Sequence, residues 1–321
     1  MRVLVTGAAG FIGSHLSERL VARGDDVVGL DNFDPFYPRA VKERNLAQLV
    51  PSPRFTLVSG DLRTPADLER ALAAARPDAV VHLAALAGVR PSLADPVRYN
   101  DVNVLGTVRV TEAARAHGVR RIVFASSSSV YGLDSEPPFK ESDPCLHPVS
   151  PYASTKRAGE LGLFTAHHLY GLDVTCLRFF TVYGPRQRPD LAIHKFASLI
   201  LAGQPIELFG DGATSRDYTW VDDIIDGVVA AIDQQGSGAP AFRIYNLGGS
   251  RTTSLLRLVE LLSDAIGRKP EIEWKAEQPG DMKRTLADVS LANKELGYAP
   301  RVPIEEGIAR FVAWAKSSSG R

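Results

Sequence analysis

The hydrophobic pattern divides the chain into strands that alternate with helices. Short apolar runs predict buried parallel strands, and apolar residues three or four positions apart predict the helices between them. The predicted strands cover residues 3–5, 26–31, 55–58, 79–83, 121–125, 174–179 and 242–247, and the predicted helices cover 13–24, 41–49, 65–75, 101–117, 152–170 and 224–232. This alternation predicts an α/β fold with a Rossmann-like, doubly wound parallel sheet.

The first predicted strand runs into a glycine-rich turn. Gly7, Gly10 and Gly13 let the main chain approach a pyrophosphate closely, and the helix that follows offers unpaired N–H groups to it. Asp31 ends the second strand, where a carboxylate can accept from both ribose hydroxyls. Asn32 comes next and carries no cation for a 2′-phosphate. The pattern therefore predicts NAD rather than NADP, although glycine turns of this spacing also serve packing alone.

Two further strand ends carry candidate cofactor contacts. Asp61 follows the third strand, where an adenine lies in a doubly wound sheet. Its carboxylate has two possible roles: it accepts from the adenine amino group, or it caps the next helix. Ala84 and Ala85 follow the fourth strand, and their small side chains leave room for a cofactor.

Tyr152 and Lys156 lie one helical turn apart, so their side chains share a helix face. A free phenol has a pKa of roughly 10, and a neighbouring ammonium lowers that pKa by stabilising the phenolate. The serine run at residues 126–129 ends the fifth strand. Ligands of parallel sheets bind outside the carboxyl ends of the strands, so these groups are expected to meet in one cleft. The alternative for the pair is a half-buried ring beside a solvated charge.

Composition narrows the possible partners. The 37 basic and 37 acidic residues balance, so no global field attracts nucleic acid or an anionic membrane. Cys145 and Cys176 form no disulfide framework, the seven histidines are scattered, and no apolar run approaches 18 residues. We expect a soluble, untargeted cytoplasmic protein that binds no metal, nucleic acid or membrane.

The pattern changes to shorter elements after residues 184–185. Residues 1–183 are predicted to form the NAD-binding domain, which residues 220–247 or so rejoin. A smaller C-terminal α/β domain for the substrate is predicted to comprise residues 184–219 and 248–316, and residues 317–321 to form a flexible tail.

Several motifs support a family resemblance that covers essentially the whole chain. Besides the glycine turn they are HLAA at 82–85, SSSSVYG at 126–132, YASTK at 152–156 and LGY at 296–298. Together they resemble the extended short-chain dehydrogenase/reductase (NAD-dependent epimerase/dehydratase) family and, within it, the UDP-sugar 4-epimerases. The segments 31–33, 87–90, 178–185, 188–190 and 278–281 look most like those of UDP-glucuronate 4-epimerases.

The resemblance implies a mechanism. Tyr152, as a phenolate, would take the proton of the sugar 4-hydroxyl while C4 gives a hydride to NAD⁺. Lys156 would lower the tyrosine pKa and bind the nicotinamide ribose, and Ser127 would hydrogen-bond the reacting hydroxyl. The 4-keto sugar would then rotate and take the hydride back on its other face, so NAD would stay bound between turnovers.

The resemblance also implies the remaining contacts. The expected cofactor-binding residues are Gly7, Gly10, Phe11, Ile12, Gly13, Asp31, Asn32, Asp61, Leu62, Leu83, Ala84, Ala85, Asn103, Tyr152 and Lys156. The expected substrate-binding residues are Arg90, Ser128, Ser129, Thr181, Arg188, Phe209, Arg216, Tyr218 and Asp281, with Phe209 against the uracil. A homodimer formed by the helices at 101–117 and 152–170 is also implied.

Substrate choice depends on a carboxylate. A 4-keto uronate is a β-keto acid that loses carbon dioxide readily, so the enzyme must hold its carboxylate in a protective geometry. Thr181 and Arg188 match carboxylate-binding positions of the family, whereas a strand-end hydroxyl and a surface cation are their alternative interpretations. Arg90 has three alternatives: a phosphate contact, a carboxylate contact and a solvated cation.

Related dehydratases and decarboxylases carry an acid where this chain has Ser128 and Ser129. We therefore expect conversion of UDP-glucuronate to UDP-galacturonate. The alternatives are a UDP-glucose/UDP-galactose 4-epimerase and a non-catalytic NAD(H)-binding protein.

Overall fold

The computed structural model describes residues 1–276 and 282–318. Its strands are β1 Arg2–Thr6, β2 Asp26–Asp31, β3 Phe55–Ser59, β4 Ala79–His82, β5 Arg121–Ser127, β6 Asp173–Phe179, β7 Thr181–Tyr183, β8 Ile206–Phe209, β9 Ser215–Trp220, β10 Phe242–Leu247, β11 Thr252–Ser254 and β12 Ile272–Lys275. Its α-helices are α1 Phe11–Arg23, α2 Arg39–Leu46, α3 Pro65–Ala75, α4 Val89–Ala94, α5 Pro96–Tyr99, α6 Gly106–Ala116, α7 Pro151–Tyr170, α8 Ala192–Ala202, α9 Val221–Gln234, α10 Leu255–Ile266, α11 Ser290–Leu296 and α12 Ile304–Ser318. A π-helix, η1 (Asn100–Leu105), and a 3-10 turn, η2 (Ser128–Tyr131), complete the described elements.

Seven parallel strands form the central sheet, in the order β10-β6-β5-β4-β1-β2-β3. The chain moves outward from β1 to β3 and then returns to the other side of β1 with β4. This reversal places a topological switch point between β1 and β4, where doubly wound sheets bind ligands. The predicted fold class is confirmed.

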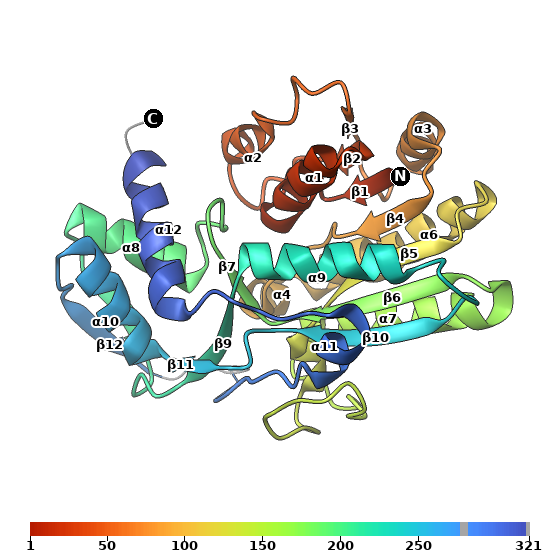
Figure 1. The fold of residues 1–321 in the computed structure, drawn as a ribbon. Helices are drawn as coiled ribbons and strands as arrows, with labels where there is room; N and C mark the ends of the chain where they lie inside the picture. Colours follow the sequence, from red (N-terminus) through yellow and green to blue (C-terminus); the bar gives the residue numbers. More distant parts are fainter. Residues whose placement is uncertain (277–281, 319–321) are drawn as a thin grey trace.

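Helices cover both faces of this sheet, as Figure 1 shows. In β1, Val3 and Val5 join the core beneath α1 and α9, whereas Leu4 joins the core beneath α3, α6 and α7. Successive strand residues point to opposite faces, so a run that is apolar throughout is what a sheet covered on both sides requires. The short β-branched runs of the sequence therefore correspond to central strands.

A smaller unit lies to one side of the sheet (Figure 1). It contains a three-stranded sheet in the order β11-β9-β7, the parallel pair β12-β8 and the helices α8, α10 and α12. Two elements depart from the predicted domain boundaries. Thr181–Tyr183 (β7) pairs with β9 of the small sheet, because the chain leaves the central sheet immediately after β6. In addition, α11 packs on α9 and β10 of the large sheet.

The helix predicted at residues 101–117 is built differently at its start. Asn100–Leu105 form a π-helix, and the regular α-helix α6 begins only at Gly106. π-Turns inside helices often occur at functional sites, because the extra residue redirects side chains. Here the π-helix carries Asn103 into the buried interior.

Candidate functional site

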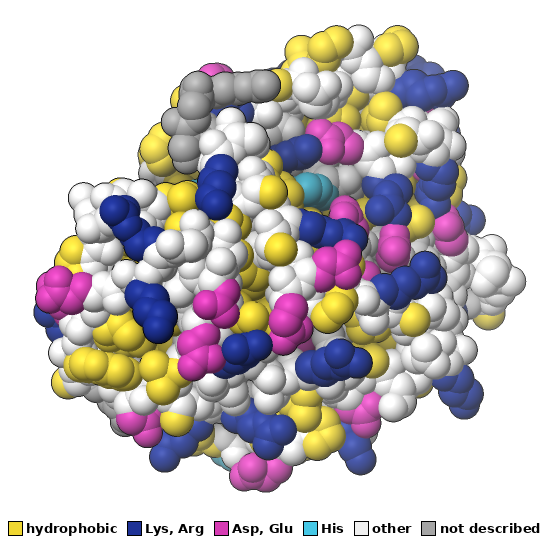
Figure 2. All heavy atoms as spheres, turned by 60° about the vertical axis from the view of Figure 1, so that its left-hand side comes forward, with side chains coloured by type: hydrophobic (Ala, Val, Ile, Leu, Met, Phe, Trp, Pro, Cys, Tyr) yellow, Lys and Arg dark blue, Asp and Glu magenta, His cyan; other side chains and the backbone are white. Residues whose placement is uncertain are grey.

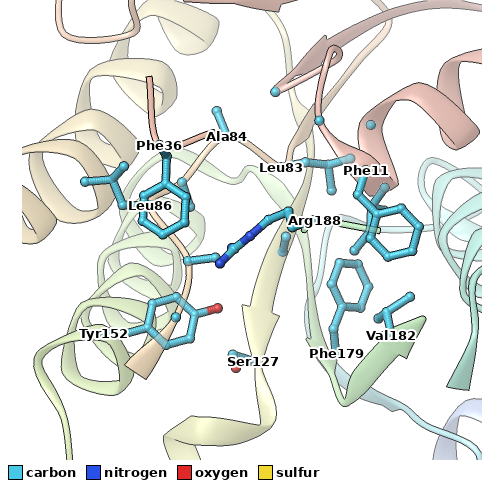
Figure 3. A pocket seen from close by; sticks show the side chains of 18 of the residues that line it. Phe11, Phe36, Leu83, Ala84, Leu86, Ser127, Tyr152, Phe179, Val182 and Arg188 are labelled. Carbon is cyan, nitrogen blue, oxygen red and sulfur yellow. The ribbon is translucent and has the colours of Figure 1, made fainter. Parts of the chain in front are cut away.

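A cavity of about 460 Å³ lies at the carboxyl ends of the central strands. The turn after β1, the end of β2, the segment after β4 and the serines that end β5 line it, together with Tyr152, Lys156, Arg188 and Arg216. The cavity thus combines the glycine turn with the predicted proton-transfer residues. Figure 3 shows part of its wall, with Phe11, Leu83, Tyr152 and Arg188 pointing into the same space.

The three glycines of the turn have three different reasons to lack a side chain. Gly7 has φ 74° and lies against the main chain of Ala84, where a Cβ would approach within 2.9 Å. A Cβ on Gly13 would lie 2.1 Å from the carbonyl oxygen of Gly7, so helix and turn pack too closely for alanine. Gly10 is the N-cap of α1 and makes no side-chain cap, which leaves the helix N-terminus open toward the cavity.

Asp31 lies where the sequence predicts it, at the end of β2 in the cavity wall. Its carboxylate accepts from the main-chain N–H groups of Ala9 (3.0 Å) and Phe33 (2.8 Å). The sequence prediction missed Lys42, a buried residue of α2 that lines the cavity with its Nζ 3.6 Å from Asp31. Only the fold brings this cation, eleven residues downstream, beside the carboxylate.

Asp61 and Leu62 also line the cavity, at the end of β3. Arg63 holds the Asp61 carboxylate through Nε (3.0 Å) and Nη2 (2.7 Å), and the Asn32 amide donates to it at 2.9 Å. The hydrogen bond from Arg63 lowers the pKa of Asp61 to about 2. Asp61 does not cap α3, whose N-cap is Thr64. Arg63 is a second residue that sequence reasoning missed.

Asn103, for which a cofactor contact is predicted, is buried and does not belong to the cavity lining. Its amide oxygen accepts from the N–H of Leu86 (2.8 Å), and its amide nitrogen donates to the Leu86 carbonyl (2.9 Å) and to Thr155 (3.0 Å). Asn103 therefore joins the segment after β4 to α7 from behind the wall. Leu83, Ala84 and Ala85 of that segment do line the cavity, as do Phe11 and Ile12 of α1.

Tyr152 stands in the first turn of α7, which Ser150 and Pro151 begin. Ser150 is the N-cap and accepts from the N–H of Ala153, while Pro151 occupies the first helical position. The Ser127 hydroxyl accepts from the N–H (3.2 Å) and the hydroxyl (2.9 Å) of Ser129. Ser127 and Tyr152 line the same cavity.

Lys156 and Tyr152 both line the cavity, and the effect of the ammonium on the tyrosine pKa stays a prediction. Lys156 donates to the carbonyl of Ala125 at 2.7 Å, and burial lowers the pKa of Lys156 to about 7. Burial raises the pKa of Tyr152, while the Ser127 hydrogen bond and the Arg188 charge oppose that rise. Helical spacing correctly places both side chains at the cavity, but it does not reveal which acceptor the ammonium meets.

A buried ion pair supports this catalytic wall from beneath. Glu160, one turn after Lys156, accepts from Nε and Nη2 of Arg178, each at 2.9 Å, and from the hydroxyl of Ser126 at 2.6 Å. Both charged side chains are almost completely shielded from solvent. Hydrogen bonds from Arg178 and Ser126 hold the pKa of Glu160 below its usual value despite burial. The pair joins β5, β6 and α7, which carry the candidate catalytic residues.

Thr181 and Arg188 lie together in the cavity lining. Arg188 is paired with Asp190, and its guanidinium lies 4.7 Å from the centroid of the Phe36 ring. Ser128 and Ser129 line the same cavity. The predicted sugar end is therefore assembled from η2, β7, the loop after β7 and the segment after β2.

The predicted nucleotide end is brought together only in part. Arg216 lines the cavity, whereas Phe209, Tyr218 and Arg90 do not. The guanidinium of Arg90 lies over the Phe209 ring at 4.9 Å and so joins α4 to β8. Tyr218 packs edge-on against Tyr183. Asp281 lies outside the described residues.

The cavity residues fit a dinucleotide. The open N-terminus of α1 suits a pyrophosphate, the glycines leave room for it, and Asp31 offers a carboxylate where a ribose would lie. Within residues 1–276 and 282–318, no group of three or more His, Cys, Asp or Glu side chains is placed to hold a metal. In the same part of the chain, no helix is long and apolar enough to cross a bilayer.

Comparisons with known proteins agree with this geometry. The chain is 41% identical to a probable UDP-glucuronate 4-epimerase of Rhizobium meliloti, covering 98% of this chain and 96% of that one. It is 42% identical to a UDP-glucuronate 4-epimerase of Thermodesulfobacterium geofontis, over 98% and 96% of the two chains. The crystal structure of UDP-glucuronic acid 4-epimerase from Bacillus cereus, solved with UDP-glucuronic acid and NAD, superimposes with a TM-score of 0.93 at 36% identity, covering 99% and 100%. Residues 3–248 match the NAD-dependent epimerase/dehydratase family, and the chain belongs to that family.

Proposed function

We propose that this protein is an NAD-dependent UDP-sugar 4-epimerase that interconverts UDP-glucuronate and UDP-galacturonate through a 4-keto intermediate. One observation carries the proposal: Ser127, Tyr152, Thr181 and Arg188 line one cavity that also contains the glycine turn. A proton-transfer group, a candidate carboxylate partner and a dinucleotide cradle therefore lie in one cavity, where substrate and cofactor would meet. When bound, NAD accepts a hydride from C4 of the sugar and returns it.

The residues divide the remaining work. Tyr152 takes the proton of the sugar 4-hydroxyl, and Ser127 donates to the oxygen on which charge develops. Arg188 favours the phenolate through its charge and binds the substrate carboxylate together with Thr181. Lys156 lies in the same wall, where we assign it to the nicotinamide ribose. The glycine turn, Asp31, Leu83 and Ala84 hold the dinucleotide.

Restraint of the carboxylate distinguishes this proposal from a neutral-sugar epimerase. A 4-keto uronate decarboxylates fastest when the C5–C6 bond to its carboxylate is perpendicular to the carbonyl plane, so fixed donors that hold another geometry protect it. Arg188 is a cation of the cavity lining that is placed for this role beside Tyr152, as Figure 3 shows. UDP-glucose/UDP-galactose epimerisation remains the alternative, because the proton-transfer residues suit both sugars.

The test is incubation with UDP-glucuronate, UDP-glucose and UDP-N-acetylglucosamine separately, with products identified by chromatography. We expect UDP-galacturonate from the first at the highest kcat/KM. Arg188→Ala should reduce kcat/KM for UDP-glucuronate far more than for UDP-glucose, because only the uronate loses an ionic contact. Equal losses of kcat/KM for the two sugars would show that Arg188 does not bind the carboxylate. If the wild-type protein turned over none of the three sugars, a non-catalytic NAD(H)-binding protein would be favoured.

We also infer a cytoplasmic homodimer that has no nucleic-acid partner. Leu105, Val108, Leu161 and Phe164 are exposed apolar residues of η1, α6 and α7, and such a patch on paired helices favours association. Both cysteines are free thiols, which suits a reducing compartment. On the face in Figure 2, basic and acidic side chains are interspersed. Sedimentation analysis would test the dimer. We expect the wild-type protein to sediment as a dimer and the Phe164→Lys variant to sediment as a monomer.

A further inference from the structure

Two neighbours fix the guanidinium of Arg188 in one plane. Its Nε donates to Oδ1 of Asp190 at 3.0 Å, and its Nη2 donates to Oδ2 at 2.6 Å. The ring of Phe36 covers one face, with its centroid 4.7 Å from the guanidinium carbon. A bidentate pair and a stacked ring together leave an arginine little rotational freedom.

These contacts leave one edge of the guanidinium available. Arginine carries five N–H donors, and Asp190 uses the edge formed by Nε and Nη2. The other edge, formed by Nη1 and the second proton of Nη2, has the fork geometry that matches a carboxylate. Nη2 lies near Gly88, where a Cβ would come within 3.6 Å. In Figure 3 the guanidinium extends toward Tyr152, so this part of the side chain points to the reacting end.

We propose that Asp190 and Phe36 are positioning residues that select a uronate by presenting the open edge of Arg188 to the substrate carboxylate. The inference rests on the proposed function and deepens it. Neither residue is expected to touch the sugar. They act through the orientation of Arg188, and this distinguishes their role from that of Thr181 in the same wall.

Asp190 acts as a support rather than as a competitor for Arg188. The Asp190 side chain is 44% exposed and stays hydrated, so water screens its repulsion of a second carboxylate. Arg188 is only 14% exposed, and without Asp190 its charge would be buried with fewer partners. The guanidinium would then turn toward other acceptors in the cavity, and its open edge would no longer match the substrate.

The same orientation controls a side reaction. In the 4-keto uronate, cleavage of the C5–C6 bond passes its electron pair to an enolate over C4 and C5, and carbon dioxide leaves. C5 then takes up a proton, which gives a UDP-4-ketopentose. A fixed Arg188 holds the carboxylate away from the perpendicular geometry that this cleavage needs, whereas a mobile one does not.

Binding without turnover is the first test. In a Tyr152→Phe background, isothermal titration calorimetry with NAD-loaded protein would compare UDP-glucuronate with UDP-glucose. We expect Asp190→Ala to weaken the affinity for UDP-glucuronate about tenfold and the affinity for UDP-glucose less than twofold. The affinity of Asp190→Asn for UDP-glucuronate should lie between those of the wild type and Asp190→Ala. Phe36→Leu, which keeps an apolar contact but removes the stacked ring, should weaken UDP-glucuronate about threefold. Asp233→Asn, which alters a surface pair with Arg23 outside the cavity, should change neither affinity.

Product partition is the second test. This test uses active protein that keeps Tyr152. Asp190→Ala should raise the share of decarboxylated UDP-pentose products relative to UDP-galacturonate, and Asp190→Asn should give a ratio closer to that of the wild type. Tighter binding of UDP-glucuronate by Asp190→Ala would identify Asp190 as a competitor and overturn the inference. Equal losses for both sugars with an unchanged product ratio would overturn it as well. Failure of the wild-type protein to convert UDP-glucuronate would instead overturn the proposed function.

Discussion

The glycine turn at residues 7–13 and the loop at residues 184–190 border the same cavity, yet different forces hold them. Hydrogen bonds of main-chain N–H groups fix the turn: Gly7 donates to the carbonyl of Leu30 at 2.7 Å, and Ala9 donates to the side-chain carboxylate of Asp31. Long side chains fix the loop: Arg186 reaches Glu18 at 2.7 Å, and Arg188 reaches Asp190. Close approach of main-chain groups therefore characterises the glycine turn, whereas charged side-chain pairs characterise the loop.

This contrast follows from what each end must recognise. A pyrophosphate is common to all dinucleotides, and N–H groups of a helix N-terminus suffice for it. A uronate must be distinguished from a neutral hexose that has nearly the same shape, and this requires a charge with fixed direction. Substitutions at the sugar end should therefore change rate and selectivity, whereas those at the cofactor end should change NAD binding.

The largest effect is expected from Tyr152→Phe, which removes the proton-transfer hydroxyl and keeps the ring. Turnover of UDP-glucuronate should fall by about 10²- to 10⁴-fold, the usual contribution of a general acid–base group. NAD content should be unchanged, because the glycine turn is untouched. Steady-state kinetics and the absorbance of bound cofactor measure both. A turnover near that of the wild type would show that another group moves the proton.

Glu160→Gln tests the support beneath the sugar end. The substitution leaves the guanidinium of Arg178 buried without a charged partner, and loss of one member of such a pair costs about 3–5 kcal/mol. Chemical denaturation should show this loss in the free energy of unfolding. Glu112→Gln, which alters the exposed pair with Arg115, is the control and should change the same quantity by less than about 1 kcal/mol. Similar values for both variants would contradict the structural role of Glu160.

Gly13→Ala tests the cofactor end. The new Cβ would meet the Gly7 carbonyl oxygen, and overpacking of this kind costs about 1–3 kcal/mol. We expect NAD affinity to fall by about tenfold to a hundredfold, measured by calorimetry on protein freed of cofactor. Gly162→Ala in α7 is the matched control, because an added Cβ would meet no atom within 4 Å apart from its chain neighbours and the backbone of its own helix. That variant should keep its NAD affinity and gain about 0.5–1 kcal/mol of stability. A normal NAD affinity in Gly13→Ala would contradict the close-packing argument.

The same contrast explains what could be read from the sequence. The central sheet and the glycine turn follow from local periodicity, because strand, turn, helix and Asp31 are contiguous. The cavity also contains the predicted Ser127, Tyr152, Thr181 and Arg188, which the resemblance indicated. Lys42 and Phe36 could not be assigned, because tertiary packing brings them to Asp31 and Arg188. Asp190 lies only two residues after Arg188, but spacing alone does not reveal that the two side chains pair.

The missed contacts share one physical cause. A side chain such as Lys156 has several acceptors within reach, and only the fold decides that it meets the Ala125 carbonyl. Asn103 is buried in a π-helix, which the apolar pattern does not reveal. The sequence therefore indicates where the site lies and which main groups it contains, but it does not reveal how the long polar side chains pair.

Arg63 is one of these missed residues, and it gives the smallest expected effect. Its hydrogen bond is the main cause of the lowered pKa of Asp61, which falls to about 2 from an unfolded value of about 3.9. A lowered carboxyl pKa stabilises the fold above the unfolded pKa, and this contribution is lost as the pH falls through about 2. Arg63 is 36% exposed, so solvent screening limits the contribution to about 1 kcal/mol or less.

We therefore expect Arg63→Gln to lower the free energy of unfolding by a constant small amount between pH 7 and 5. The difference from the wild type should shrink below pH 4 and vanish near pH 2, as urea denaturation at each pH would show. The variant also decides what Asp61 does for the cofactor. If the carboxylate binds the adenine amino group, release from Arg63 should leave NAD affinity unchanged or raise it. A tenfold loss of NAD affinity would instead show that Arg63 holds Asp61 in the position that the cofactor needs, and that the cofactor end, too, depends on a charged pair.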